Sequence, residues 1–421
     1  MIETEPKSDP EQSGRKRFFS GYGIGHTDLN STAIEKPGSL VGRYKLLNVL
    51  GEGGYGVVYL AEQQESIKRR VALKIIKPGM DSSAVLVCFE AERQMLAMLE
   101  HPNIARIFDA GVTETGRPFF VMEYIQSTPI TEFCDANKYS ILDHLSLFLD
   151  VCDAIQYAHQ KGIIHCDIKP TNILVGNGHD KPAPKIIDFG IATAVDRPLT
   201  EGMLHTEQGQ LLGTPDYMGP EQAEMIGGDI DTRSDIYSLG VVLYELLSGV
   251  LPFDPKTLRE KGLEGIRSTI RDCEPPRPST RLSSLGKSTH EIASKRATKA
   301  GLLTRRLSRE LEWIPLKAMH KQRDRRYRTA SELADDIRNY LSGNPLIAGP
   351  ESTLYLAGKF FRKHRYGLSV VALLLTITIG YLFTLIHLYG QQRQTNRDLS
   401  EALNSLTCAT SADGKQLQTI L

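Results

Sequence analysis

The chain has 421 residues, of which 41% are hydrophobic and 24% are charged, proportions typical of a globular protein with a substantial buried core. Its 50 Lys and Arg residues balance its 50 Asp and Glu residues, so the formal net charge is zero. A balanced charge gives no electrostatic attraction to a polyanion, and we therefore expect no nucleic-acid partner. The six cysteines are scattered without a C-x-x-C pair, which argues against a zinc site or a disulfide framework.

The first part of the chain, residues 1–43, is polar and shows no sustained hydrophobic period, so we expect a mostly disordered segment. Its opening residues contain no apolar run of the length that a secretory signal needs, and we expect this end to remain in the cytoplasm. From Tyr44 onward, short apolar runs typical of strands begin, and beyond about residue 140 longer helical patterns follow. This order predicts a small strand-rich part and a larger helical part.

A glycine-rich stretch, residues 51–56, reads Gly-Glu-Gly-Gly-Tyr-Gly and fits the G-x-G-x-x-G pattern. In a dinucleotide-binding fold such glycines open a helix, but here a β-branched and aromatic run, Val57 to Leu60, favours a strand. A Walker A loop is excluded because no Gly-Lys-Ser/Thr follows. The pattern therefore predicts a β-hairpin that closes over phosphate groups.

The next strand pattern carries Lys74, and the segment after it offers this lysine a carboxylate. On a helix at ~100° per residue, Glu92 lies at the centre of an apolar face, whereas Glu90 points toward solvent. An unpaired carboxylate on a buried face costs several kcal/mol, so we expect Glu92 to have a cationic partner. Lys74 is the natural candidate.

The stretch His165-Cys166-Asp167-Ile168-Lys169-Pro170-Thr171-Asn172 combines a carboxylate, a lysine and an amide at short spacing, and Asp188-Phe189-Gly190 follows a short apolar segment. Phosphoryl transfer requires a carboxylate that orients the hydroxyl nucleophile, cations along the phosphates and oxygen ligands for Mg²⁺. A single Asp is most often an exposed loop residue, but this combination in this order predicts a site for phosphoryl transfer.

With these motifs, the chain resembles the eukaryotic-type (Hanks) protein kinases, and in particular the bacterial membrane-anchored Ser/Thr kinases, over residues 44–341. The resemblance implies a bilobal α+β fold, with a small antiparallel β-rich lobe containing one helix and a larger helical lobe. It also implies a serine/threonine protein kinase that uses ATP and Mg²⁺ on protein substrates. The catalytic residues would be Asp167 as the base, Lys169 beside the transferred phosphate, and Lys74 on the ATP phosphates.

The resemblance further implies which residues hold the nucleotide and the metal. Asn172 and Asp188 would bind magnesium, Glu92 would hold Lys74, and Met122 would be the gatekeeper before the adenine-binding hinge. The ATP-binding set is Gly51, Glu52, Gly53, Gly54, Tyr55, Gly56, Val58, Ala72, Lys74, Glu92, Met122, Glu123, Ile125, Asn172 and Asp188.

Further motifs of the resemblance lie beyond the catalytic loop. Residues 213–218 resemble a substrate-docking segment, Glu221 would pair with Arg326, and Asp235 would cap the catalytic loop from a buried helix. Lys169 and Thr214 are the family's marks of serine/threonine specificity. Two positions depart from the family pattern: Gly219 replaces Ala in A-P-E, and Cys166 replaces Arg in H-R-D.

The departure at Cys166 has a regulatory consequence. The arginine of H-R-D helps to bind a phosphate on the activation loop through charge-assisted hydrogen bonds, and a thiol has no positive charge. The loop between Gly190 and Gly213 contains Thr193, Thr200 and Thr206. We therefore expect phosphorylation of this loop, if it occurs, to contribute little to activity.

Near the C-terminal end, Gly367 to Ile386 contains no charged residue, and at ~1.5 Å per residue it spans ~30 Å, the thickness of a bilayer core. Basic residues crowd its N-terminal side: Lys359, Arg362, Lys363 and Arg365. The positive-inside bias therefore predicts a single-pass protein of the cell membrane with a cytoplasmic catalytic domain. The expected organisation is a lead (1–43), a kinase domain (44–341), a basic juxtamembrane segment (342–366), a transmembrane helix (367–389) and a short tail (390–421).

Two alternatives remain open from the sequence. A pseudokinase would use the same fold as a scaffold, although Lys74, Asp167, Asn172 and Asp188 are all present. A sensor would bind a ligand beyond the membrane, but residues 390–421 are short, polar and without a motif. That tail could instead be part of a longer outer region or a pairing helix around Leu399, Ala402, Leu403 and Leu406, and a homodimer is a further hypothesis.

Overall fold

The computed structural model describes residues 35–53, 56–65, 68–77, 98–176, 181–189, 215–223 and 230–418. The chain divides into two compact units. The first extends to Ser342 and includes Leu346–Gly349; the second consists of Gly343–Pro345 and the chain from Pro350.

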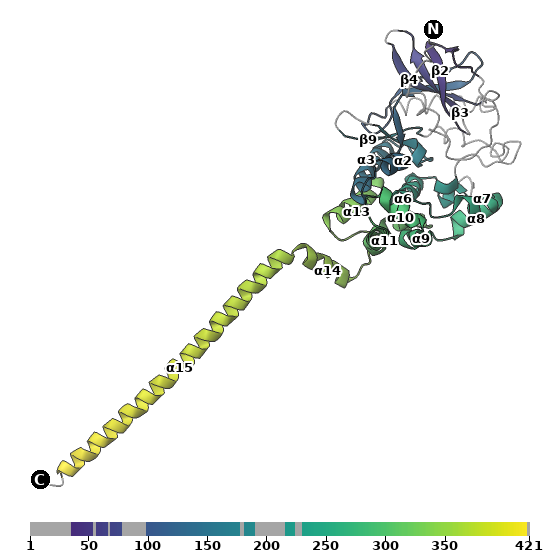
Figure 1. Ribbon diagram of the computed structural model, residues 1–421. Helices are drawn as coiled ribbons and strands as arrows, with labels where there is room; N and C mark the ends of the chain where they lie inside the picture. The colour runs from purple at the N-terminus through teal and green to yellow at the C-terminus, as the bar shows by residue number, and fades with distance from the viewer. Residues whose placement is uncertain are drawn as a thin grey trace, which may run out of the picture. The chain divides into compact units, whose positions relative to one another are not determined.

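The first unit contains two antiparallel sheets. Figure 1 shows strands β2, β3 and β4 gathered at one end of this unit, with its helices at the other. The larger sheet has the order β1-β2-β3-β4-β6-β5, and the smaller one has the order β7-β8-β9. The strands are β1 (Leu40–Val41), β2 (Tyr44–Glu52), β3 (Gly56–Gln63), β4 (Arg69–Ile76), β5 (Ile107–Val112), β6 (Pro118–Glu123), β7 (Ser127–Pro129), β8 (Ile173–Gly176) and β9 (Ala183–Ile186).

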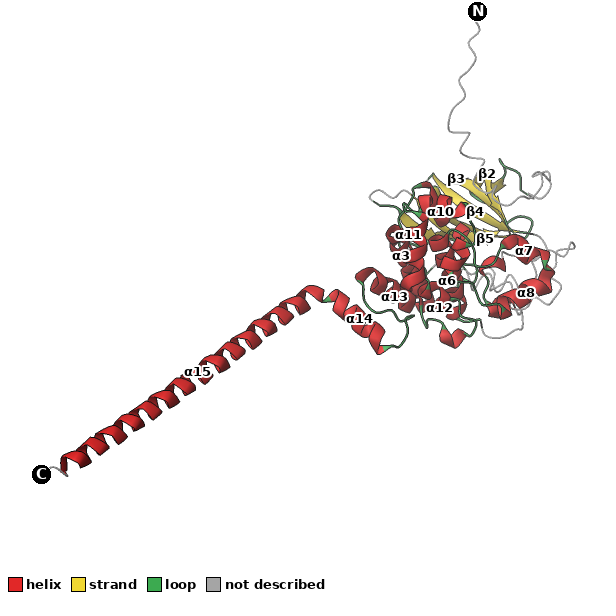
Figure 2. Ribbon diagram, turned by 60° about the horizontal axis from the view of Figure 1, so that its bottom comes forward, coloured by secondary structure: helices red, strands yellow, loops and turns green. Residues whose placement is uncertain are grey.

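Helices form the rest of this unit, drawn in red in Figure 2. The α-helices are α2 (Ile130–Ala136), α3 (Ile141–Gln160), α5 (Pro220–Ala223), α6 (Thr232–Ser248), α7 (Pro255–Glu260), α8 (Gly262–Asp272), α9 (Pro278–Ser283), α10 (Ser288–Lys295), α11 (Ala300–Arg306), α12 (Trp313–Ala318) and α13 (Ala330–Ser342). Single turns of other helix types lie at η2 (Pro170–Asn172), η4 (Pro215–Tyr217), η5 (Leu307–Leu311) and η6 (Arg323–Arg325).

Local signals in the sequence determine where the two central helices begin and end. Ser140 and Asp143 form a capping box at the start of α3, because each side chain binds the backbone N–H of the other residue. The Asp231 side chain accepts from the N–H of Arg233 at the start of α6, and Gly249 ends that helix with a φ of 75°. Helix α6 is buried along nearly its whole length, as predicted for the helix that carries Asp235.

Two large hydrophobic cores stabilise the described part of the first unit, beside a small cluster of Ala223, Leu258, Ile266 and Ile270. The smaller core lies on the β-sheet and includes Tyr44, Leu46, Tyr59 and Leu73, which are almost fully buried. The larger core joins α3, α6, α12 and α13 and continues to Ala72, Phe120 and Met122 of the sheet. The predicted α+β bilobal fold, with an antiparallel small lobe and a helical large lobe, is confirmed, and the helix expected in the small lobe lies outside the described residues.

A buried carboxylate ties the end of this unit to its helices. Asp336 of α13 is completely buried, and it accepts hydrogen bonds from the Tyr327 hydroxyl (2.7 Å) and from the amides of Ile347 (2.6 Å) and Ala348 (2.8 Å). Leu346 is part of the large core. Residues 346–349 are therefore fastened to the catalytic unit, although the expected boundary was residue 341.

The other expected boundaries also differ from the structure in detail. Residues 35–43 are ordered, because Glu35 forms an ion pair with Arg117 and Val41 is buried next to β2, so the fold begins before Tyr44. In the second unit, helix α14 (Thr353–Lys363) precedes helix α15 (Arg365–Gln418). The predicted span of residues 367–389 lies within α15, which continues through most of the predicted tail (Figure 1).

Candidate active site

The glycine-rich stretch forms a hairpin between two strands, as predicted, and does not open a helix. Gly51 pairs with Val58 across β2 and β3, and the N–H of Gly53 donates to the carbonyl of Gly56 at 2.9 Å. A Cβ atom on Gly56 would overlap the backbone carbonyl oxygen of Ile75, so only glycine fits there. Gly54 and Tyr55, also predicted to bind ATP, lie outside the described residues.

The expected adenine side of the site lies on neighbouring strands. Ala72 pairs with Met122 between β4 and β6, and Val58 pairs with Lys74 between β3 and β4. Met122 also lines a small cavity of about 20 Å³, whose other walls are Leu99, Ile104, Ala105, Ile107, Phe120, Ile186, Ile187, Asp188 and Phe189. The strands thus bring the predicted gatekeeper next to the predicted magnesium ligand.

The predicted hinge residues begin at Glu123, the last residue of β6. The Glu123 carboxylate forms an ion pair with Lys185 of β9 at 2.7 Å, and its N–H donates to the carbonyl of Arg106. Ile125 lies in the connection to β7, where its carbonyl accepts from the Ser127 hydroxyl at 3.2 Å. Glu123 therefore joins the two sheets, a contact that the sequence did not predict.

Lys74 lies on β4 and is buried, with its ammonium group 3.1 Å from the carboxylate of Asp188. Asp188 adopts a left-handed backbone conformation, with a φ of 60° that is uncommon for a residue other than glycine. The predicted partner of Lys74, Glu92, lies outside the described residues. The described part of the site thus places the predicted phosphate-binding cation against a predicted magnesium ligand.

Two of the predicted catalytic residues, Asp167 and Lys169, meet in the segment before β8. The Lys169 ammonium group lies 2.7 Å from Oδ2 of Asp167, and Asn172 donates to the same oxygen at 3.0 Å and to the Asp167 carbonyl at 2.7 Å. Asn172 is buried and ends η2, directly before β8. These contacts fix the orientation of the Asp167 carboxylate, which is what a base that positions a hydroxyl group requires.

Asp235 of α6 caps this loop, as predicted. Its carboxylate is fully buried and accepts from the amides of His165 and Cys166, both at 2.8 Å, and it binds Nε2 of His159 at 2.7 Å. Burial opposes ionisation, but the hydrogen bond and charge of His159, together with His165, hold the pKa of Asp235 below its usual value. Cys166 has a φ of 63°, so this capping supports a strained backbone.

The His165 side chain connects the two catalytic loops. Its ring packs on that of Phe189 with 4.6 Å between centroids, and its Nε2 lies 3.0 Å from the carbonyl oxygen of Ile187. The Asp167 amide donates to its other ring nitrogen at 3.3 Å. Sequence reasoning assigned His165 no role beyond its place in the motif; its ring contacts the residues on both sides of Asp188 and the amide of Asp167.

The segment after the predicted activation loop is anchored to the catalytic loop. The Gln222 side chain donates to the carbonyl of Cys166 at 2.7 Å and accepts from the amide of Gly219 at 3.1 Å. The Ser238 hydroxyl of α6 donates to the carbonyl of Tyr217 at 2.8 Å. Sequence reasoning missed Gln222, whose only signal is its place directly after Glu221. Thr214 lies outside the described residues.

The oxygen donors of this site suit magnesium. Among the residues that the structure describes, no group of three or more His, Cys, Asp or Glu side chains could hold a metal without help. The amide of Ile187 donates to the carbonyl of Asn172 at 2.9 Å, which places Asn172 next to the segment that carries Asp188. One amide and one carboxylate oxygen match a Mg²⁺ ion whose remaining ligands are phosphates and waters.

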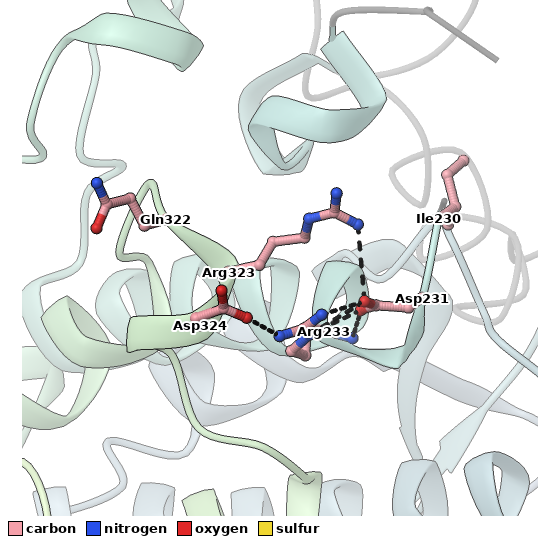
Figure 3. Close-up of a pocket in the computed structure, with 6 residues that line it drawn as sticks. All are labelled: Ile230, Asp231, Arg233, Gln322, Arg323 and Asp324. Atoms are coloured by element: carbon pink, nitrogen blue, oxygen red, sulfur yellow. Dashed lines mark hydrogen bonds and ion pairs between the residues drawn. The ribbon is translucent and has the colours of Figure 1, made fainter. Parts of the chain in front are cut away.

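A larger hollow lies elsewhere, between the start of α6 and η6, with a volume of about 490 Å³ (Figure 3). Its charged groups are paired with one another, because Arg233 bridges Asp231 (2.7 Å) and Asp324 (2.6 Å), and Arg323 lies 3.6 Å from Asp231. None of the predicted site residues lines it. Its ion pairs fasten the start of α6 and are separate from the catalytic loop.

A bilobal fold with this hairpin, lysine and pair of loops defines the protein kinases, and the chain belongs to that family. The protein kinase domain family matches residues 44–335. The chain is 34% identical over 315 residues to serine/threonine-protein kinase PknB of Mycobacterium tuberculosis, which covers 73% of this chain and 44% of that protein. It is 39% identical over 219 residues to serine/threonine-protein kinase Pkn1 of Myxococcus xanthus, which covers 52% of this chain and 30% of that protein. The matched regions are thus less than half the length of these relatives.

Solved structures agree on the fold. The kinase domain of Mycobacterium tuberculosis PknI aligns with a TM-score of 0.51 at 23% identity, covering 72% of this chain and 99% of that domain. At this identity the likeness establishes the kinase fold alone.

Proposed function

We propose that the chain is an active serine/threonine protein kinase that transfers the γ-phosphate of ATP to hydroxyl groups of protein substrates. The observation that carries this proposal is the arrangement of Asp167, whose carboxylate is held by Lys169 and Asn172 at 2.7 and 3.0 Å. A scaffold would have no need for a carboxylate fixed in this way. The names of the relatives and Lys169 support Ser/Thr specificity.

In this proposal each residue has a chemical task. The hairpin of residues 51–56 covers the nucleotide, and Lys74 binds its phosphates. Asp167 orients the attacking hydroxyl and accepts its proton, while Lys169 offsets charge on the transferred group. Asn172 and Asp188 would hold Mg²⁺, which supplies neutralisation of phosphate charge when it is bound.

Phosphate transfer to a generic basic protein, measured with Mg²⁺ and ATP, tests the proposal. We expect Lys74→Met and Asp167→Asn each to lower the rate by at least ~100-fold, since positioning or proton transfer is lost. Lys45→Met, an exposed lysine of the same sheet, and Asp153→Asn, a surface aspartate, are the matched controls and should change little. ATP binding without turnover in the unsubstituted chain would instead indicate the scaffold.

We further propose that α15 crosses the cell membrane once, with the kinase domain in the cytoplasm. Within the described residues, one helix is long and apolar enough to do so, over residues Arg365–Ser405, with a mean hydropathy of 2.3 in its most apolar window. The apolar side chains of this helix are exposed, which argues against a buried core helix. The roles assigned to the kinase-site residues are likewise proposals. A homodimer formed through the C-terminal part of α15 is a further proposal.

Extraction of membranes with carbonate tests the span. The full chain should stay in the membrane, and a chain that ends at Ser352 should be released. Leu374→Arg places a charge mid-span at an apparent cost of ~2.5–3.5 kcal/mol and should reduce insertion. Retention of the shortened chain would contradict a single anchor.

A further inference from the structure

Helix α14 has an apolar face that the described residues of its own unit leave exposed. At ~100° per residue, its apolar side chains fall on one arc of about 160°: Leu354, Leu356, Ala357, Phe360 and Phe361. The exposed fraction is 83% for Leu354 and 60% for Phe361, and no residue of α14 is buried. A contiguous exposed face of this kind marks an interaction site.

The opposite arc of α14 is cationic. It carries Lys359, Arg362 and Lys363, and Arg365 follows directly, while residues 353–366 contain no acidic residue. Lys363 donates to the Asn344 side chain at 2.6 Å, and Lys359 lies 6.0 Å from the ring of Tyr355, but all these groups stay at the surface. These side chains thus form a basic arc at the surface of α14.

The position of α14 in the chain indicates which surface. Only His364 separates it from α15, and there the backbone leaves helical geometry, with φ −101° and ψ 17°. At ~1.5 Å per residue, Lys363 is about 6 Å along the chain from Gly367, where the predicted apolar span begins. A helix of 11 residues is too short to cross a bilayer, which takes about 20.

We propose that α14 is an interfacial helix that lies on the cytoplasmic membrane surface and binds anionic lipid headgroups. Its apolar face enters the boundary between headgroups and acyl chains, and Lys359, Arg362 and Lys363 reach the phosphates around it. This inference rests on the proposed span, which keeps α14 at high local concentration beside the bilayer. It assigns a lipid partner to a segment outside the kinase fold.

The full chain, incorporated in lipid nanodiscs, allows the test. Tryptophan is introduced on the apolar face as Phe361→Trp and on the cationic face as Tyr355→Trp, and the native Trp313 of the kinase domain supplies the baseline. With phosphatidylserine present, brominated lipid should quench the Phe361→Trp signal at least about twofold more than the Tyr355→Trp signal. Phosphatidylcholine alone should give weaker quenching of both.

Charge is tested in the Phe361→Trp chain. Replacing Lys359, Arg362 and Lys363 by Gln should remove the gain from phosphatidylserine, since each charge near the surface contributes about fivefold to binding. Arg393→Gln with Arg397→Gln, on the other side of the predicted span, is the matched control and should leave quenching unchanged.

Three results would overturn the inference. Equal or absent quenching of the Phe361→Trp and Tyr355→Trp signals, in chains that copurify with nanodiscs, would refute the interfacial position of α14. The proposed span would remain intact. Blue-shifted emission from Phe361→Trp without quenching would show that protein covers this face. A chain that fails to enter nanodiscs would refute the span and the inference with it, whereas kinase activity, measured separately, tests neither.

Discussion

Glu221 and Arg326, 105 positions apart in the chain, form a bidentate ion pair with nitrogen–oxygen distances of 2.7 and 2.9 Å. Burial alone would raise the pKa of Glu221, but the hydrogen bonds and charge of Arg326 hold it below its usual value. Arg326 also donates to the carbonyls of Arg233 and His320. The pair therefore joins the segment after the activation loop to α6 and to the chain before α13.

Breaking this pair should destabilise the kinase domain strongly. Glu221→Gln leaves the buried guanidinium without a counter-charge, and we expect a loss of about 3 kcal/mol in the free energy of unfolding. Urea unfolding of a chain that ends at Ser352 measures it. The control is Asp153→Asn, which breaks an exposed pair with Arg338 and should cost less than about 1 kcal/mol. Similar losses in the two variants would contradict the assigned role of Arg326.

Gly56→Ala should disturb the hairpin over the nucleotide. The added methyl group would overlap the carbonyl oxygen of Ile75, a backbone atom that cannot turn away. A cost of about 1–3 kcal/mol would lower kcat/KM for ATP at least about fivefold. Gly301→Ala, on α11 and outside the predicted nucleotide site, is the control, because its Cβ would meet no atom within 4 Å. Equal kinetics for the two variants would show that close packing at Gly56 does not matter.

Glu245 of α6 should give the domain a pH-dependent stability. Burial raises its pKa to about 7, although the Tyr217 hydroxyl, 2.7 Å away, and Arg296 oppose this shift. The folded state then binds more protons than the unfolded state between the ordinary pKa and about 7, so stability should fall as pH rises through this range. The contribution is at most about 3 kcal/mol.

The measurement compares urea unfolding of the unsubstituted domain and Glu245→Gln at several pH values from 4.5 to 8. Glutamine cannot ionise, so the fall in stability should shrink and the variant should gain relative stability above pH 7. A steeper fall in the variant would show that Glu245 is not the group responsible.

Cys166→Arg should make activity depend on phosphorylation of the activation loop. Cys166 lies between His165 and Asp167, the proposed catalytic base, and an arginine there could pair with a loop phosphate. We expect phosphatase treatment to leave kcat of the unsubstituted chain nearly unchanged and to lower kcat of Cys166→Arg. Cys166→Ser, which adds no charge, is the control. A large loss of kcat in the dephosphorylated unsubstituted chain, or in Thr200→Ala/Thr206→Ala, would refute the hypothesis.

The sequence predicted those parts of the molecule that depend on local pattern or on motifs of the family. β-branched residues after Gly56 indicated a strand, and the motifs indicated the roles of Asp235 and Arg326. The contacts of Gln222 with Cys166 and of Glu123 with Lys185 join residues 56 and 62 positions apart. Such contacts arise only after the lobes pack, and a polar residue in a loop carries no periodic signal for them.

The extent of the helices around the proposed membrane span was harder to predict for a related reason. Hydropathy marks where apolar residues end, but helix propensity does not stop there, so α15 continues past residue 389 to Gln418. The interruption between α14 and α15 at His364 likewise has no glycine or proline that would indicate it in the sequence.

The contacts of Asp336 have a mechanical consequence. Because this carboxylate holds the amides of Ile347 and Ala348, and Leu346 is buried, the chain leaves the catalytic domain at Gly349 and not at the end of α13. A pull that arrives from the C-terminal side would load these two hydrogen bonds first. Because Asp336 lies on α13, the tension would enter that helix through its carboxylate, and residues 337–345 would bear it only after Asp336 had released the segment.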